Sequence, residues 1–182
     1  MRLLRSGCMV LVGALVGGAT AAGDGGSLHR PLHLRHVPHG APCPVSKGHV
    51  KLFGPGTPMG ITDAGPAHFM SVGGAPPGVV DISWTPLDPK RYKGQKAPWV
   101  IDRTYRGPVL IRGMRLDAPG PVRFSEGGDR RVSALHLGRG ERVQPSGRRV
   151  LAALLLVQAP GCYGLQVDGL TFSQTIVVRV RG

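Results

Sequence analysis

The chain has 182 residues, a formal net charge of +13, 29 Gly and 17 Pro, and 41% of its residues are hydrophobic. This apolar content excludes a wholly disordered chain, which would bury too little apolar surface to offset the entropy lost on folding. The length suits one domain with a removable leader. The positive charge favours contact with anionic surfaces or polymers.

Residues 1–22 have the layout of a secretory signal peptide. Two arginines precede an apolar run over residues 9–16, and small residues end the segment. We therefore expect cleavage after Ala21 or Ala22. The apolar run is too short to span a bilayer, so no transmembrane anchor is expected after cleavage. The sequence thus predicts a chain of net charge +11 that is secreted or held in the periplasm or cell envelope.

Residues 23–42 are expected to be a flexible lead-in that is rich in histidine. Four imidazoles fall within eleven residues: His29, His33, His36 and His39. Imidazoles on such a segment can capture Zn²⁺, Cu²⁺ or Ni²⁺. Two prolines prevent one helical face from presenting all four, so a solvated tail is the alternative to a metal site.

Residues 43–182 are expected to form a single β-domain. Residues 53–78 are rich in Gly, Pro and Thr without periodicity, which predicts a long surface loop. Short strands are expected afterwards, at residues 80–84, 99–101, 109–116, 122–124, 132–137 and 150–157, with a basic loop at 90–96. A β-bulge at Gly113 would direct Met114 and Leu116 inward, together with Val109 and Ile111.

The last twenty residues carry the clearest fold signal. Asp168-Gly169 lies between two apolar runs and predicts a two-residue type I′ turn, with Leu165 opposite Phe172. Alternation then gives one dry face and one wet face. The dry face comprises Tyr163, Leu165, Val167, Leu170, Phe172, Ile176, Val178 and Val180. We therefore expect an all-β fold, an Ig-like antiparallel β-sandwich with long Gly/Pro-rich loops.

Two cysteines remain after the expected cleavage, Cys43 and Cys162. An even pair in an oxidising compartment is most simply a disulfide. Free thiols and a metal-binding pair are the alternatives.

A basic stretch with interleaved aromatic residues is the strongest binding candidate. On one sheet face it would attract an anionic polymer, with the aromatic rings supplying stacking or sugar contacts. A solvated outer face whose aromatic residues belong to the core is the alternative. The residues expected to carry the contact are Arg103, Arg106, Arg112, Arg115, Trp99 and Tyr105.

Three motifs together resemble those of a family of secreted bacterial proteins without an assigned activity. They are a C-P-V-[ST] start at residues 43–46, a G-x-R-L-D-A-P middle at 113–119 and a G-C-[WY] hairpin that begins at 161. The resemblance covers residues 43–182. It implies an Ig-like sandwich and a Cys43–Cys162 pairing, and it extends neither to the His-rich lead-in nor to residues 53–78.

Enzyme signatures are missing from the sequence. It has neither a G-x-S-x-G nor an H-E-x-x-H motif, and its ten acidic residues are scattered. We therefore expect a non-catalytic exported protein without a cofactor, binding or structural at the cell envelope. The expected partner is an anionic envelope polymer or another envelope protein, and no specific nucleic acid. The alternative is a metal-binding exported protein that uses the four histidines.

Overall fold

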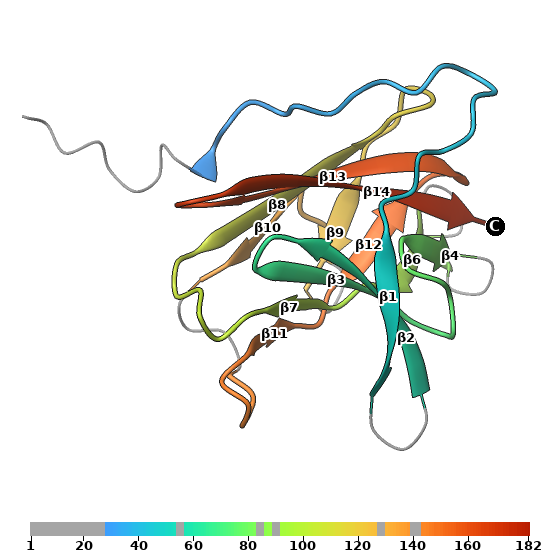
Figure 1. The fold of residues 1–182 in the computed structure, drawn as a ribbon. Coiled ribbons are helices and arrows are strands. Elements are labelled where there is room, and N and C mark those ends of the chain that lie inside the picture. The colour runs from blue at the N-terminus through green and yellow to red at the C-terminus, as the bar shows by residue number, and fades with distance from the viewer. Residues whose placement is uncertain (1–27, 54–56, 83–85, 89–91, 127–129, 139–142) are drawn as a thin grey trace, which may run out of the picture.

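The structure is a computed structural model that describes residues 28–53, 57–82, 86–88, 92–126, 130–138 and 143–182. The signal peptide expected at residues 1–22 and its cleavage site lie outside these ranges. Within them the chain forms fourteen strands in three sheets, which confirms the all-β class (Figure 1). No helix in the described ranges is long and apolar enough to cross a membrane.

The sheets contain five, five and four strands, named below in their spatial order. The first sheet comprises β1 (Gly48–Phe53), β2 (Thr57–Ala64), β3 (Ala67–Ser71), β7 (Trp99–Ile101) and β11 (Arg149–Leu151). The second sheet comprises β10 (Ala134–Leu137), β8 (Val109–Arg115), β13 (Gly161–Gly169), β14 (Ser173–Arg181) and β4 (Val79–Asp81). The third sheet comprises β5 (Pro86–Asp88), β6 (Tyr92–Lys96), β12 (Leu154–Val157) and β9 (Arg123–Ser125). Neighbouring strands are antiparallel, except that β4 runs parallel to β14.

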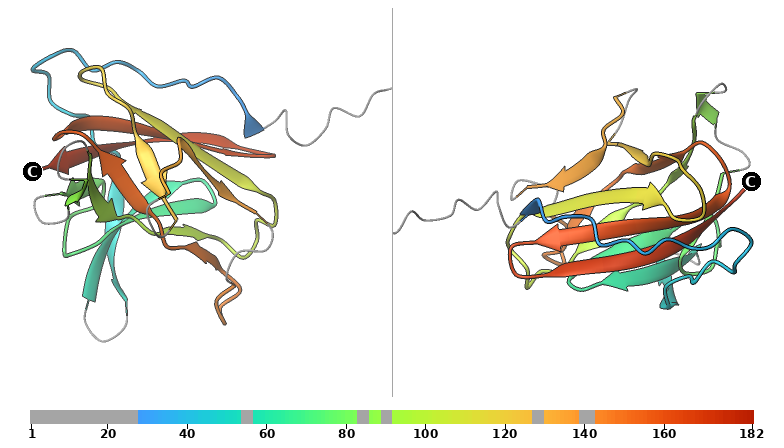
Figure 2. Two further views of the ribbon diagram at one scale, coloured as in Figure 1. Left: turned by 180° about the vertical axis from the view of Figure 1, so that it is seen from behind. Right: turned by 90° about the horizontal axis from the view of Figure 1, so that it is seen from above.

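The first and second sheets form two facing layers, and the third sheet stands between them along one side (Figures 1 and 2). One hydrophobic core joins all three sheets. Phe69 and Trp99 enter it from the first sheet, Leu165 from the second, and Phe124 and Leu155 from the third. A core that depends on all three sheets makes the described ranges one β-sandwich-like unit.

The C-terminal hairpin is confirmed, but its register differs from the prediction. Leu165 pairs with Ile176 and Asp168 with Ser173, so the turn is wider than two residues. The Gly169 N–H donates to the Phe172 carbonyl oxygen at 2.9 Å across this turn. The predicted partner of Leu165 was therefore wrong by four residues. Because four is an even number, the same strand face still points to the core.

The face of β13 that was expected to be wet is buried. Residues 28–46, which we call the strap, run along the outer side of the second sheet over β8, β13 and β14 (Figure 2). The Val37 N–H donates to the Leu116 carbonyl oxygen, and the Ser46 N–H to the Val177 carbonyl oxygen. The strap buries Cys162 together with Val37 and Leu116 in a second apolar cluster. The structure thus seats residues 28–42 on the sheet, in place of the flexible lead-in predicted from composition.

The Cys43–Cys162 disulfide is present, with 5.5 Å between the two Cα atoms. It joins the strap to the beginning of β13, on the face opposite to the main core. Structural disulfides of this kind are typical of compartments outside the reducing cytoplasm.

The long loop predicted over residues 53–78 was wrong for most of its length, because β2 and β3 form a hairpin there, whereas residues 72–78 do form an irregular connection. Only two residues, Gly65 and Pro66, connect Ala64 to its partner Ala67. Gly65 has a φ of 65°, and proline holds a negative φ, which is the φ pattern of a type II′ hairpin turn. At Gly65 and Pro66 the Gly- and Pro-rich composition therefore marks a tight turn and not an irregular loop.

The β-bulge predicted at Gly113 is absent, since β8 pairs with β13 in one continuous register. Val109 and Ile111 face the core as expected. Met114 points away from the core and is 43% exposed, and Leu116 packs against the strap. Both were predicted to face inward. The register is unbroken because Gly113 has no side chain, which leaves room for Leu165, its paired residue on the neighbouring strand β13.

Two further strand predictions need correction. The apolar run at 150–157 was expected to be one buried strand, but it divides into β11 and β12, which belong to different sheets. The basic loop expected at 90–96 contains strand β6 over its described residues. The prediction of a strand at 99–101 is confirmed by β7.

Replacing Gly113 with Ala is expected to lower the free energy of unfolding by about 1–3 kcal/mol, the usual cost of overpacking a core. A Cβ there would lie 2.5 Å from Leu165 Cδ2 and 2.7 Å from the Gly164 carbonyl oxygen. Gly120→Ala is the matched control, because its Cβ would meet only the flexible Arg115 side chain, at 3.3 Å. Urea unfolding of both variants measures the difference. Equal stabilities for the two variants would contradict the close packing at Gly113.

Candidate functional site

The basic stretch expected to form one binding face is divided between different environments. Trp99 is 1% exposed and packs edge-on against Phe69, with the ring centroids 5.3 Å apart. The Tyr105 hydroxyl donates to the Pro108 carbonyl oxygen at 2.9 Å and accepts from the Leu170 N–H at 2.8 Å. Both aromatic side chains therefore serve packing and turn formation, as the alternative interpretation of this stretch expected.

Arg112 and Arg115 are both ion-paired on β8. Arg112 donates to Asp168 at 2.7 Å and to the Arg30 carbonyl oxygen of the strap. Arg115 donates to Asp117 at 2.6 Å. Burial alone would raise the pKa of Asp117, but hydrogen bonds from Arg115 and from the Cys162 N–H outweigh it, so this pKa is lowered. These two guanidinium groups have carboxylate partners within the fold. They therefore do not form one binding face with Arg103 and Arg106.

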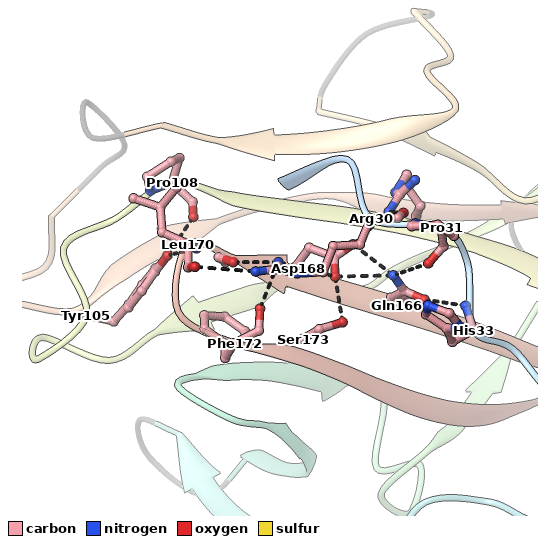
Figure 3. Close-up of polar contacts among 12 residues, drawn as sticks. Arg30, Pro31, His33, Tyr105, Pro108, Gln166, Asp168, Leu170, Phe172 and Ser173 are labelled. Carbon is pink, nitrogen blue, oxygen red and sulfur yellow. Dashed lines mark hydrogen bonds and ion pairs between the residues drawn. The ribbon is translucent and has the colours of Figure 1, made fainter. Parts of the chain in front are cut away.

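The strap rests on a buried polar network in the second sheet (Figure 3). Asp168 has no solvent exposure, and it accepts hydrogen bonds from Ser173 at 2.6 Å, from Gln166 at 3.0 Å and from Arg112. Gln166 also donates to the Pro31 carbonyl oxygen at 3.0 Å and accepts from the His33 N–H at 2.7 Å. The carboxylate and the amide are both engaged, so this network holds the strap in place.

Arg30 attaches the start of the strap to the C-terminal hairpin. Its guanidinium donates to the carbonyl oxygens of Gly169 at 2.8 Å, Phe172 at 3.2 Å and Leu170 at 3.3 Å (Figure 3). These acceptors lie at the end of β13 and in the turn between β13 and β14. One strap arginine therefore donates hydrogen bonds to three backbone carbonyl oxygens at the wider turn observed there.

The four histidines expected as metal ligands lie separately along the strap. All four are exposed, and the His29 ring is near that of His136, with 6.1 Å between the centroids. His33 contacts Gln166 through its backbone N–H and not through its ring. Across the described ranges, no group of three or more His, Cys, Asp or Glu side chains has a geometry that could hold a metal ion.

The outer face of the first sheet carries a second group of interacting polar side chains. Asp63 pairs with His68, His68 with Val100, and Val100 with Val150, so one row of side chains crosses β2, β3, β7 and β11. Directly paired residues point to the same side of a sheet. The neighbouring residues Phe69 and Trp99 fill the core. This row therefore faces away from the core.

Five side chains form a continuous series of contacts along this face, in which a histidine or arginine alternates with an aspartate. His49 Nδ1 lies 3.7 Å from Asp63 Oδ2, and His68 Nδ1 lies 2.7 Å from Asp63 Oδ1. His68 Nε2 lies 3.2 Å from Asp102 Oδ2, and Arg148 Nε lies 3.8 Å from Asp102 Oδ1. A neutral imidazole has one N–H and can donate to one carboxylate only, whereas an imidazolium can donate to both. The arrangement thus orients His68 from both sides and connects it, through Asp102, to Arg148.

Three adjoining hollows follow this face, and we call them together the groove. The first, of about 330 Å³, contains this series of five side chains. The second, of about 500 Å³, is lined by Asp102, Arg103, Thr104, Ser146 and Arg148. The third, of about 470 Å³, is largely apolar and is lined by Met59, Met70, Pro98, Val100, Gln144, Pro145, Ser146, Arg148 and Val150. Arg148 lines all three, so its side chain lies at their junction.

The second hollow is suited to an anion. Arg103 and Arg148 supply two guanidinium groups, and Thr104 and Ser146 supply two hydroxyls. Gly147, with a φ of 77°, makes the tight turn that places Ser146 and Arg148 on the same side as Arg103. Guanidinium groups and hydroxyls are common ligands of phosphate and carboxylate oxygens. We refer to this second hollow as the anion hollow.

Sequence reasoning identified one residue of this groove, Arg103, and missed the others. Asp63 and His68 are five positions apart, and their pairing follows only once the Gly65-Pro66 turn is recognised. Asp102 and Arg148 come from segments 46 residues apart, and no local signal in the sequence connects them. Arg106, the remaining predicted arginine, is exposed on the connection between β7 and β8 but does not line the groove.

No protein-family model, curated protein or solved structure matches the chain.

Proposed function

We propose that this is an exported, non-catalytic β-sandwich protein that binds an anionic ligand, such as a cell-envelope polymer, in the groove of the first sheet. The observation that carries the proposal is the anion hollow, where two arginines and two hydroxyls surround one space. Within the described ranges, Arg103 has no ion pair, and Arg148 contacts Asp102 only at 3.8 Å. Both guanidinium groups therefore remain available to an incoming anion.

The charge of the whole chain supports this proposal. A net charge of +13 for the full chain, or about +11 without the two leader arginines, raises the local concentration of anions around the protein and speeds their encounter with it. Among the described residues, the strap covers the second sheet and contributes no side chain to the groove, which lies on the first sheet and suits a long polymer. Export is proposed from the leader-like residues 1–22 and agrees with the Cys43–Cys162 disulfide. The Ig-like arrangement of the sandwich belongs to the same proposal.

Replacing Arg103 and Arg148 together with Gln is expected to weaken retention of the oxidised chain on immobilised heparin or polyphosphate. Each contact between a cation and a polyanion adds about 0.7–0.9 to the slope of log K against log salt. Since the variant loses two such contacts, we expect the slope to fall by about 1.5. Elution measured at a series of salt concentrations gives this slope.

The matched control replaces Arg179 and Arg181 with Gln, which removes the same charge from exposed positions of β14 in the second sheet. If the control lowers the slope as much as the double variant in the groove, binding depends on net charge alone. The anion hollow would then not be the site. Retention by the native chain that does not respond to salt would exclude an anionic ligand.

A further inference from the structure

We infer that the ligand of the groove is an amphiphilic anion, with its charged group in the anion hollow and its hydrocarbon part in the adjoining apolar hollow. This inference rests on the proposed function and specifies the class of its ligand. The observation behind it is that the two hollows have Ser146 and Arg148 in common. A molecule that reaches from one to the other passes directly beside the Arg148 side chain.

The apolar hollow has a floor of side chains from the first sheet. Met59, Met70, Val100 and Val150 project from four different strands, β2, β3, β7 and β11. Pro98 and Pro145 add apolar surface without a backbone N–H. A polymer bound only through its charges would leave this apolar surface in water. A hydrocarbon chain placed on it would gain the free energy of removing apolar surface from water.

The turn at residues 143–149 forms the wall between polar and apolar parts of the groove. Val143 bridges to Arg149, the Gln144 N–H donates to the Arg148 carbonyl oxygen at 2.8 Å, and the Gly147 N–H donates to the Gln144 carbonyl oxygen at 2.8 Å. This hydrogen-bonded turn holds Pro145 on the apolar hollow, and it holds Ser146 and Arg148 on both hollows. The division into a charged and an apolar part is thus fixed by the backbone.

The remaining charges of the groove favour an anionic head group of modest size. Asp102 lines the anion hollow but is neighboured by both His68 and Arg148. Lys51 and His49 line the hollow beyond it. A carboxylate or a phosphate can therefore contact Arg103 and Arg148 while the single carboxylate nearby stays compensated. Carboxylate and phosphate head groups share this chemistry, and the test distinguishes them.

The test is a calorimetric titration of the native chain with two chain-length series, alkyl carboxylates from acetate to decanoate and alkyl phosphates from methyl to decyl phosphate. All are used below the concentrations at which they form micelles. Each CH₂ group that enters the apolar hollow is expected to raise the affinity about fourfold, the equivalent of about 0.8 kcal/mol per buried CH₂. The series with the higher affinity at equal chain length identifies the head group. An uncharged alcohol of the same length should bind at least about tenfold more weakly, because it lacks the charge-assisted hydrogen bonds to the guanidinium groups.

Variants separate this inference from the proposed function. Val150→Thr places a hydroxyl in the apolar hollow with little change of volume, and Met59→Gln removes apolar surface at the edge of the same hollow. We expect the combined variant to lose most of the chain-length dependence but to keep salt-dependent retention on heparin. Val50→Thr is the matched control, because Val50 is 60% exposed on β1 and lies outside the hollow. Thermal unfolding of each variant checks that it is folded.

Each outcome has a defined meaning. If alkyl chain length leaves the affinity of the native chain unchanged while anions still bind through Arg103 and Arg148, the amphiphile is excluded and the proposed function stands. If the alcohols bind as tightly as the charged series, the head group does not use the anion hollow, which also overturns the inference. Chain-length dependence that disappears in the Val150→Thr/Met59→Gln variant and persists in Val50→Thr supports it.

Discussion

Removing the disulfide by replacing both Cys43 and Cys162 with Ala is expected to lower the free energy of unfolding by about 4–5 kcal/mol. This figure follows from the entropy of closing a loop of 119 residues in the unfolded chain. The tether also holds the strap on the second sheet, where it covers Leu116 and the outer side of β13. Urea unfolding of the oxidised native chain and of the double variant measures the difference.

Chemical reduction of the native chain is the control for the substitutions themselves. The reduced native chain and the double alanine variant should have similar stabilities, since both lack the tether. A loss well below about 2 kcal/mol, the lower end of typical disulfide contributions, would mean that the unfolded chain gains little freedom when the bond is absent. The remaining contacts of the strap would then be sufficient to order the N-terminal segment.

Replacing Asp168 with Ala is expected to lower the free energy of unfolding by about 3–5 kcal/mol, because it leaves charged and polar partners buried without their acceptor. Asp168 is fully buried and is bonded to Arg112, Gln166 and Ser173. Urea unfolding measures the loss. Asp63→Ala is the matched control, since the Asp63 side chain is 51% exposed and ion pairs at such positions are worth about 0–1 kcal/mol.

A double-mutant cycle with Arg112→Ala tests the mechanism of this loss. If the two substitutions act through one buried pair, the combined loss should be smaller than the sum of the single losses. Additive losses, or an Asp168→Ala loss no larger than that of Asp63→Ala, would contradict the role assigned to the network. Because Asp168 and Arg112 lie outside the groove, their variants should keep the salt-dependent retention expected of the native chain.

The strap and the groove lie on different sheets and have separate roles. The strap, its disulfide and its polar network cover the second sheet, which explains why the predicted wet face of β13 is buried. The groove is formed by side chains on the outer face of the first sheet, which the strap does not reach. Stability and binding can therefore be changed independently, which is what makes the proposed variants informative.

The sequence indicated one residue of the candidate site, but it did not indicate which other residues make up the site. The basic stretch contained Arg103, which lines the anion hollow, but it also contained Arg112 and Arg115, which have carboxylate partners in the fold. Charge density along the chain does not show whether a carboxylate from another strand will neutralise an arginine. Asp168 lies 56 residues from Arg112, so their pairing depends on how β13 docks against β8.

The features that follow from local rules could be predicted from the amino-acid sequence. Period-2 alternation predicted β13 and β14, because successive side chains of a strand point to opposite faces. The all-β class followed from the scarcity of helical periodicity, and the disulfide from an even pair of cysteines. The hairpin of β2 and β3 was missed because Gly and Pro, which form its tight turn, were interpreted as signs of an irregular loop.

The strap and the groove depend on contacts between distant parts of the chain. The strap is seated on the second sheet by contacts such as those from Arg30 to the C-terminal turn, which join residues about 140 positions apart. The groove is assembled from residues between 49 and 150, which come together through the pairing of β1, β2, β3, β7 and β11. Strand pairing places side chains according to register, and register across distant strands is set by burial of the common core. Local sequence patterns do not contain that register, so these two features appear only in the folded chain.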